Sequence, residues 1–248
     1  MKLEGKTAVI SGAASGIGRA TADTFAQAGA HVILTDINVT DGEAAAAAIR
    51  ARGHGADFLR VDLTDAASID ALRRDALAKR ERVDVVANVA GWGKNEPFVK
   101  NTPEFWRKMI DLNLLGTIFL TRAFLDPMIE RRAGRIVNVA SDAGRVGSLG
   151  ESVYSGTKGG VIAFTKGLAR EMARYGINVN CVCPGPTDTP LMAAVPDKLK
   201  DAFANATPMR RLAKPSEVAD AILFFSSARA DFVTGQVLSV SGGLTMAG

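Results

Sequence analysis

A glycine-rich turn between a strand pattern and a helical pattern restricts most what this chain can fold into. The apolar run Thr7–Ser11 leads into Gly12–Gly18 (GAASGIG), and an Ala-rich helical pattern then runs to about Gly29. Glycines permit a sharp turn and let a phosphate approach the backbone, where the first N–H groups of the helix attract its charge. The spacing Gly-x-x-x-Gly-x-Gly differs from the commoner Gly-x-Gly-x-x-Gly. Because a strand precedes the turn and a helix follows it, we predict a phosphate-binding loop.

Strand patterns alternate with helical patterns along all 248 residues. This alternation predicts an α/β fold: a Rossmann-type, doubly wound parallel sheet of about seven strands with helices on both faces. We expect one domain over residues 1–248, without repeats or linkers. Residues 187–212, rich in Ala, Pro and Met, are expected to form a mobile cover over a substrate.

Composition and charge exclude several classes of function. The net charge of +4 comes from scattered Lys and Arg, so we expect no nucleic-acid partner. We see no signal-peptide pattern and no apolar run that approaches a membrane span, so we expect a cytoplasmic protein without a membrane partner. The histidines and cysteines do not cluster as metal ligands do, so no metal is expected. Cys181 and Cys183 are expected to point to opposite faces of one strand, as buried small hydrophobes.

Two acids end neighbouring strand patterns. Asp36 closes His31–Asp36, about twenty residues beyond the glycine turn, where a carboxylate can accept hydrogen bonds from both adenosine ribose hydroxyls. It would repel a 2′-phosphate, and Ile37 and Asn38 offer no cation, so NAD is favoured over NADP. Asp62 ends the next strand pattern. It either contacts the adenine edge or caps the following helix, and both readings stay open.

A tyrosine, a lysine and a serine suggest proton chemistry. Tyr154 and Lys158 are four residues apart in a helical pattern, so they share one face with about 5–6 Å between their Cβ atoms. A cation there would lower the phenol pKa from about 10 toward the range of a general base. Ser141 closes an apolar strand pattern, so its hydroxyl is expected at the carboxyl edge of the sheet, where open α/β sheets bind ligands.

With these pieces in order, the chain resembles the short-chain dehydrogenase/reductase family from end to end. Two departures are Val89, where that family usually has a second Asn, and Ser11 in place of Thr. The residues that carry the resemblance are Gly12, Gly16, Gly18, Asp62, Asn88, Ala90, Gly91, Asn113, Ser141, Tyr154, Lys158, Pro184, Gly185 and Thr189.

The resemblance implies an NAD-dependent oxidoreductase that interconverts a secondary alcohol and a ketone, usually as a homotetramer. Tyr154 would exchange the proton, and Ser141 would hydrogen-bond the reacting oxygen. Lys158 would bind the nicotinamide ribose, and Asn113 would anchor a proton-carrying water. The implied cofactor contacts are Gly12, Ser15, Gly16, Ile17, Gly18, Asp36, Asp62, Leu63, Asn88, Ala90, Gly91, Tyr154, Lys158, Pro184, Gly185, Thr187 and Thr189.

Three segments are similar to a narrower group within the family. Ser141–Ser148, Cys183–Thr189 and Gly235–Met246 look like those of 2-hydroxycyclohexanecarboxyl-CoA dehydrogenases and related enzymes of ring-bearing alcohols. We therefore expect an alicyclic or aromatic small-molecule substrate, with a CoA thioester of that type among the options. A 3-oxoacyl-carrier-protein reductase is the enzyme alternative, although that reduction usually draws on NADPH. A non-catalytic dinucleotide-binding regulator is the alternative from another class.

A ring-binding pocket is expected beside the reactive residues. Trp92, Leu149, Leu191 and Met192 come from loops at the same edge of the predicted sheet, and would join Ser141 and Tyr154 around a ring. The competing reading of Trp92 is packing against its own loop. Four basic residues would meet CoA phosphates or a carboxylate, with ordinary surface charge as the alternative: Lys94, Arg145, Arg210 and Arg211.

Overall fold

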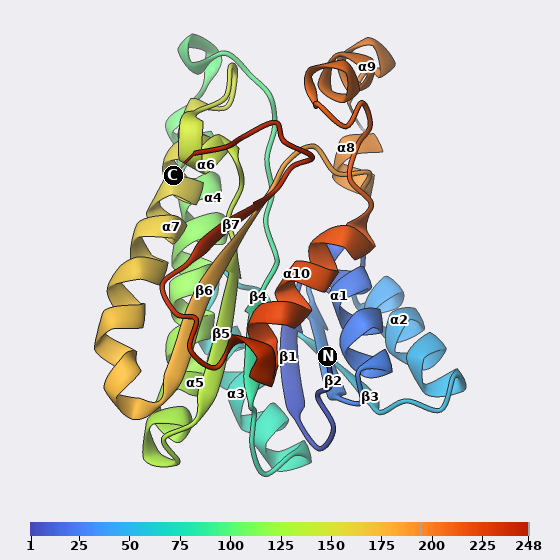
Figure 1. Cartoon of the computed structure of the whole chain (residues 1–248), viewed down its shortest axis with the longest axis vertical. Helices are drawn as coiled ribbons and strands as arrows, with labels where there is room; N and C mark the ends of the chain where they lie inside the picture. Colours follow the sequence, from blue (N-terminus) through green and yellow to red (C-terminus); the bar gives the residue numbers. More distant parts are fainter. Residues whose placement is uncertain (194, 248) are drawn as a thin grey trace.

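The computed structural model describes residues 1–193 and 195–247 and shows a parallel seven-stranded sheet between two layers of helices (Figure 1). The strand order is β3-β2-β1-β4-β5-β6-β7, and every neighbouring pair is parallel. The predicted fold class is therefore confirmed. The strands are β1 (Thr7–Ser11), β2 (His31–Asp36), β3 (Ala56–Arg60), β4 (Val85–Asn88), β5 (Gly134–Val139), β6 (Ile177–Pro184) and β7 (Val237–Val240).

Helices connect successive strands and cover both faces of the sheet (Figure 1). Gly176, with φ 69°, ends the helical segment before β6 in the left-handed conformation that favours glycine. The helices are α1 (Gly16–Gln27), α2 (Val39–Ala51), α3 (Ala66–Lys79), α4 (Pro103–Ile110), α5 (Gly116–Glu130), α6 (Ala143–Val146), α7 (Ser152–Met172), α8 (Pro190–Ala193), α9 (Asp197–Ala206) and α10 (Pro215–Ser226), with shorter turns η1 (Phe98–Lys100), η2 (Asp111–Leu115), η3 (Ala173–Tyr175) and η4 (Ala228–Ala230).

Alternating apolar residues on the strands divide the core into two layers. Ile10 and Leu34 lie in one cluster with α1, α2 and α10, whereas Val9 and Ile33 lie in the other with α3, α5 and α7. Successive strand residues point to opposite faces, so a strand buried on both sides reads as a continuous apolar run. This is why β1, which is buried along its whole length, has three consecutive apolar residues from Ala8 to Ile10.

The sheet changes direction between β1 and β4. The chain adds β2 and β3 on one side of β1, and places β4 to β7 on the other. Open α/β sheets bind ligands beyond the carboxyl ends of the strands at such a switch point. The glycine turn, Asn88 and Ser141 all lie at or just beyond these carboxyl ends.

The helical stretch Pro103–Glu130 differs from the sequence-based expectation in two ways. It is continuous over 28 residues, with the π-helical turn η2 in its middle. By length and composition it could cross a membrane, so the expectation that no apolar run approaches that length is wrong here. Leu120, Phe124 and Met128 on this stretch pack in the core of the sheet, and core helices of globular domains pass the same test.

Residues 187–212 contain the helices α8 and α9, which lie beyond the carboxyl ends of the strands (Figure 1). The role of this segment as a mobile cover over a substrate stays a prediction.

One further expectation, about the two cysteines, needs correction. Cys181 and Cys183 share one face of β6 and pack together with Val161 of α7. The prediction of opposite faces was wrong because residues two apart on a strand point the same way. Both cysteines are buried free thiols.

A chain of buried amides and hydroxyls ties the middle of the sheet to its helices. Asn88 donates to the Oδ1 of Asn138 (2.8 Å) and to the hydroxyl of Thr121 (2.9 Å). Asn138 in turn donates to the hydroxyl of Thr165 on α7 (2.9 Å). Buried polar groups are costly unless they are paired, so this network fixes α5 and α7 on β4 and β5.

Asn138→Ala is expected to lower the free energy of unfolding by about 2–3 kcal/mol, because it leaves buried partners without a hydrogen bond. Urea unfolding followed by circular dichroism measures the change. Asn205→Ala on the exposed face of α9 is the control and should stay within about 0.5 kcal/mol of the unmodified protein. An equal loss in both variants would contradict this role.

Candidate active site

The glycine turn brings the ends of β1 and β4 into backbone contact. Gly12 has φ 68°, and a Cβ there would lie 2.8 Å from the Cα of Ala90. A Cβ on Gly18 would lie 2.1 Å from the carbonyl oxygen of Gly12, so only glycine fits either position. The cap residue Ser15 makes no side-chain hydrogen bond to α1, and the first turn of that helix has no acid. No side chain of the cap or of the first turn therefore competes with an anion for the N–H groups at the start of α1. The turn fits a dinucleotide phosphate.

Asp36 is held against the glycine turn by the backbone. Its Oδ2 accepts from the N–H of Ala14 (3.1 Å), and its Oδ1 accepts from the N–H of Asn38 (3.0 Å). These bonds fix a carboxylate at the place where a dinucleotide ribose would lie relative to the phosphate loop. Arg60 stands opposite Asp36 in the register of β2 and β3, a cation that inspection of Ile37 and Asn38 did not reveal.

Asp62 forms the turn that leads into α3. Its Oδ1 accepts from both the N–H (2.9 Å) and the hydroxyl (2.7 Å) of Thr64, and these bonds hold the pKa of Asp62 below its usual value. The backbone N–H of Asp62 donates to the hydroxyl of Ser68 (2.9 Å), and Leu63 is buried. The cap of α3 is Asp65, whose side chain accepts from the N–H of Ala67 (2.9 Å), so the capping reading of Asp62 was wrong and its adenine contact stays a prediction.

The Ser11 hydroxyl joins two neighbouring strands of the sheet. Its Oγ accepts from the N–H groups of Val89 (3.0 Å) and Ala90 (3.1 Å), which joins the carboxyl ends of β1 and β4. Just beyond, a Cβ on Gly91 would lie 3.0 Å from Asn113 Oδ1 and 3.1 Å from Lys158 Nζ. The structure therefore gathers the β4 end, Asn113 and Lys158 in one place.

Asn113 lies within the π-helical turn η2 and is fully buried. Its amide donates to the carbonyl of Trp92 (2.8 Å), and its Oδ1 accepts from the N–H of Trp92 (2.9 Å). This pair of bonds fixes the loop after β4 against the helix. Single π-helical turns recur at functional sites because they move one residue out of the regular helical phase.

Ser141, Tyr154 and Lys158 come together beyond the end of β5. Lys158 Nζ lies 5.9 Å from the centre of the Tyr154 ring and donates to the carbonyl of Val139 (2.9 Å). The Ser141 hydroxyl lies near the Tyr154 phenol and acts to lower its pKa, and the Ser141 Oγ accepts from the N–H of Ala143 (3.1 Å). The predicted proximity of the three side chains is therefore present.

The loop after β6 closes the other side of the site. Gly185 donates its N–H to Val240 (3.0 Å), and the Thr187 hydroxyl donates to the Gly185 carbonyl (2.9 Å). The methyl of Thr189 lies 3.3 Å from where a Cβ on Gly16 would be, so this loop lies against the glycine turn. The loop after β6 and the glycine turn are therefore in contact at the switch point of the sheet.

Comparison with known families agrees with this geometry. Residues 12–245 match a family model described as enoyl-(acyl carrier protein) reductase. The chain belongs to the short-chain dehydrogenase/reductase family. It is therefore an enzyme, an oxidoreductase whose nucleotide-binding fold takes NAD or NADP.

Relatives of this short-chain dehydrogenase/reductase cover its whole length. The 3-oxoacyl-[acyl-carrier-protein] reductase of Thermotoga maritima is 38% identical over 99% of this chain and 100% of its own. A (2S)-[(R)-hydroxy(phenyl)methyl]succinyl-CoA dehydrogenase subunit of Thauera aromatica is 36% identical over 99% of both chains.

Two solved structures superpose closely on it. A 3-oxoacyl-[acyl-carrier protein] reductase of Brucella melitensis with bound NAD has a TM-score of 0.92 and 36% identity, with 98% of this chain and 92% of that chain covered. An actinorhodin polyketide ketoreductase with NADPH has a TM-score of 0.94 and 33% identity, with 98% and 99% covered.

The residues proposed for a ring pocket differ in their surroundings and exposure. The Trp92 ring packs edge-on against Phe105 of α4 (5.8 Å between centres), with the Lys108 ammonium 4.0 Å from its centre. Trp92 therefore packs against α4 rather than against its own loop, a contact that neither reading named. Leu149 is 96% exposed and Leu191 is 49% exposed, so a role for them with Met192 around a ring stays a prediction.

The four basic residues suggested for an anionic group all have partners within the chain. Lys94 pairs with Glu96 at 2.7 Å, and Arg211 pairs with Glu217 at 2.6 Å. Arg210 donates to the Asn205 carbonyl (2.5 Å), and Arg145 donates to the hydroxyl of Ser239 (2.8 Å). Structural roles therefore account for them at least as well as phosphate contacts do.

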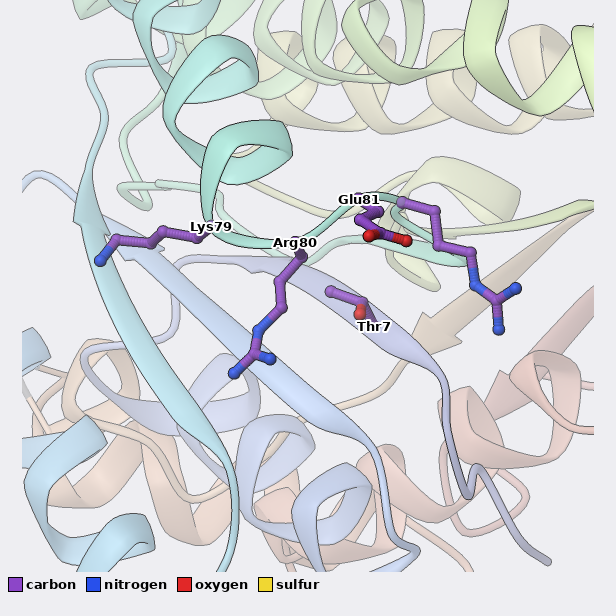
Figure 2. A pocket seen from close by; sticks show the side chains of 5 residues that line it. Thr7, Lys79, Arg80 and Glu81 are labelled. Atoms are coloured by element: carbon purple, nitrogen blue, oxygen red, sulfur yellow. The ribbon is translucent and has the colours of Figure 1, made fainter.

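A hollow at the opposite end of the sheet is separate from this site (Figure 2). It measures about 410 Å³ and lies beside Thr7, the first residue of β1, at the amino edge of the sheet. Lys79, Arg80, Glu81 and Arg82 complete its lining.

Sequence reasoning missed two glycines that shape the reactive end of α7. A Cβ on Gly93 would lie 3.3 Å from the Tyr154 ring. A Cβ on Gly144 would lie 2.6 Å from the carbonyl carbon of Lys158. The glycines were visible in the sequence, but which surface each one meets depends on tertiary structure.

Burial sets the pKa values of the reactive pair. It raises the pKa of Tyr154 to about 12, with Glu151 adding to the rise and the Ser141 hydrogen bond opposing it. Burial also lowers the pKa of Lys158 to about 8. The prediction that the Tyr154 pKa lies below its ordinary value was wrong. Burial of the phenol raises this pKa by more than the neighbouring side chains lower it.

Lys158→Met is expected to remove activity yet raise the free energy of unfolding by about 2 kcal/mol at pH 7, because a buried ammonium is costly. The Lys158 pKa lies lower in the folded chain than the ordinary lysine value of 10.5, so the unfolded chain binds more protons between about pH 8 and 10.5. The free energy of unfolding of the unmodified protein therefore rises with pH across that window. The difference in stability between Lys158→Met and the unmodified protein becomes smaller as a result.

Urea unfolding at pH 7 and at pH 10 measures both effects. Lys166→Met, on the exposed side of the same helix, is the matched control and should show neither. A loss of stability in Lys158→Met at pH 7 would show that the amine stabilises the fold.

Proposed function

We propose that this enzyme is an NAD(H)-dependent oxidoreductase that interconverts a 3-oxoacyl and a 3-hydroxyacyl thioester. The meeting of Ser141, Tyr154 and Lys158 at the carboxyl edge, beside the glycine turn, is the observation that carries the proposal. The names of the relatives support the substrate class, because an acyl carrier protein and CoA both bear acyl groups as thioesters.

The relatives shift the preferred substrate away from the one expected from the loop segments. Names of the 3-oxoacyl-[acyl-carrier-protein] reductase kind favour the enzyme alternative over a general ring-bearing alcohol. A ring-bearing thioester remains the second candidate, because the Thauera aromatica relative is named for a phenyl-bearing succinyl-CoA. The non-catalytic regulator is disfavoured because Asn113, Ser141, Tyr154 and Lys158 are all in place.

Each reactive side chain has a task that its position allows. The Tyr154 hydroxyl exchanges a proton with the substrate oxygen, and Ser141 donates a hydrogen bond to that oxygen as charge develops. Lys158 supplies positive charge below the phenol and a donor for the cofactor ribose. Asn113 holds the loop after β4 in place. The nicotinamide, when bound, supplies or accepts the hydride.

Asp36 supports NAD as the preferred cofactor. Its fixed carboxylate would meet the 2′-phosphate of NADP as a like charge, which costs several kcal/mol unless a cation intervenes. The structural relatives include complexes with NAD and with NADPH, so the family alone leaves the choice open. The homotetramer and the cytoplasmic location that we expect from the sequence stay predictions.

Catalytic efficiency with NADH should exceed that with NADPH by about two orders of magnitude, given the cost of opposing like charges. Asp36→Ala should bring the two catalytic efficiencies closer together, by lowering the efficiency with NADH and raising that with NADPH. The double variant with Arg60→Ala should lose this rise in efficiency with NADPH. Steady-state kinetics with both cofactors measures this, and Asp70→Ala on α3 is the control. Equal efficiencies in the unmodified enzyme would refute the role of Asp36.

Oxidation of NADH with acetoacetyl-CoA and with an acetoacetyl carrier protein tests the function directly. Tyr154→Phe should lower turnover about 100-fold or more, because the exchangeable proton is lost. Tyr175→Phe, at the far end of the same helical segment, should keep near-normal turnover. In the opposite direction, oxidation of the 3-hydroxyacyl thioester with NAD, turnover should rise with pH as Tyr154 deprotonates. Turnover of cyclic ketones without turnover of either thioester would favour a ring-bearing alcohol instead.

A further inference from the structure

The short helix α6 sets how Ser141 lies relative to Tyr154 and Lys158. It begins two residues after Ser141 and packs directly on α7. A Cβ on Gly144 would lie 2.8 Å from the backbone nitrogen of Gly159 as well as 2.6 Å from the carbonyl carbon of Lys158. The two helix backbones therefore touch without an intervening side chain. Any shift of α6 moves the serine relative to the other two reactive groups.

A four-residue helix cannot hold such a position by itself, because helix nucleation is unfavourable. Asp142, which is only 5% exposed, provides part of the support. Its N–H donates to the Pro184 carbonyl (3.1 Å), and its Oδ1 accepts from the Ser239 hydroxyl of β7 (2.5 Å). The residue next to the serine is thus tied to two strands.

Arg145 completes the support from α6 itself. Its Nη1 donates to the Ser239 Oγ at 2.8 Å, and its Nη2 donates to the carbonyl of Ala247. The guanidinium therefore joins α6 to β7 and to the segment Ser241–Ala247. That segment also contacts residues 187–212, because the Met209 N–H donates to the Gly242 carbonyl (3.2 Å).

We propose that Arg145 is a positioning residue that acts through Ser239 and Asp142 to hold the Ser141 hydroxyl against Tyr154. The segment Ser241–Ala247 then links the substrate cover to the catalytic serine through the same guanidinium. The inference rests on the proposed function, and it assigns Arg145 to the serine rather than to a CoA phosphate.

A pH profile distinguishes positioning from simple stabilisation. The groups near the Tyr154 phenol are Glu151, which directly precedes α7, Lys158 from α7, Cys183 from β6, and Ser141. Of these, the Ser141 hydrogen bond lowers the Tyr154 pKa, whereas Glu151 and Cys183 raise it. If Ser141 moves away, the pKa of Tyr154 rises, and oxidative turnover needs a higher pH to reach half of its maximum.

The experiment compares Arg145→Met, Ser239→Ala and the double variant. Each single variant should lower turnover about tenfold, because small misplacements of a catalytic group are costly, while the Michaelis constant for NADH changes less than about twofold. The double variant should be no worse than either single variant, since both break one network. The midpoint of the pH profile should move upward in all three, and Arg145→Lys should restore part of the turnover.

Arg135→Met is the matched control. Arg135 is an arginine on β5 that pairs with Asp231 and donates to Asn178 (3.2 Å), at the amino end of the strand that leads to Ser141. Its loss should lower the melting temperature without moving the midpoint of the pH profile. If Arg145→Met fails to fold, Ser239→Ala and Arg145→Lys carry the same measurements.

Two outcomes would overturn the proposal. A lower melting temperature with unchanged turnover and pH midpoint would make Arg145 a purely structural residue. A higher Michaelis constant for acetoacetyl-CoA with unchanged turnover would return it to the role of a phosphate contact. Failure of the proposed function looks different, because the unmodified enzyme itself would then turn over no thioester. In that case, the Arg145 and Ser239 variants would be compared with the unmodified enzyme on a ring-bearing alcohol that the unmodified enzyme oxidises.

Discussion

The backbone contact between the ends of β1 and β4 is the constraint on which the rest of the site depends. Gly12 and Ala90 approach so closely that no side chain fits between them. The Ser11 hydroxyl accepts two hydrogen bonds from the backbone at the end of β4, from Val89 and from Ala90. This contact lies at the switch point of the sheet, where parallel strands leave their carboxyl ends free. The phosphate loop, the β4 end and the reactive end of α7 all take their places from it.

The reactive pair illustrates a trade between stability and chemistry. Lys158 is buried and Tyr154 is partly buried, in places that oppose their charged forms. The fold tolerates this because the sheet and α7 are held by apolar packing and by the Asn88–Asn138–Thr165 network. Perturbed pKa values of this kind cluster at functional sites, where a protonation state matters more than stability does.

The parallel sheet, the two layers of helices and the grouping of Ser141, Tyr154 and Lys158 could be predicted, because periodicity and spacing encode them locally. The faces of Cys181 and Cys183 were also encoded, and were misread. The setting of Trp92, the partners of Arg145 and the burial of Tyr154 could not be predicted, since they depend on which distant segments meet. Asp36 lies between these cases: its strand position was predictable, whereas the cation opposite it on β3 was not.

The π-helical turn η2 has a consequence for the helix beyond it. Each residue of an α-helix turns by about 100°, so a single wide turn changes the angular phase of everything that follows. Asn113 can then face the loop after β4 while Leu120, Phe124 and Met128 still face the sheet. Removing one residue from η2 would make the helix regular and force a choice between these two orientations. The number of residues in this turn, more than their identity, therefore allows one continuous helix to place side chains both in the core and at the site.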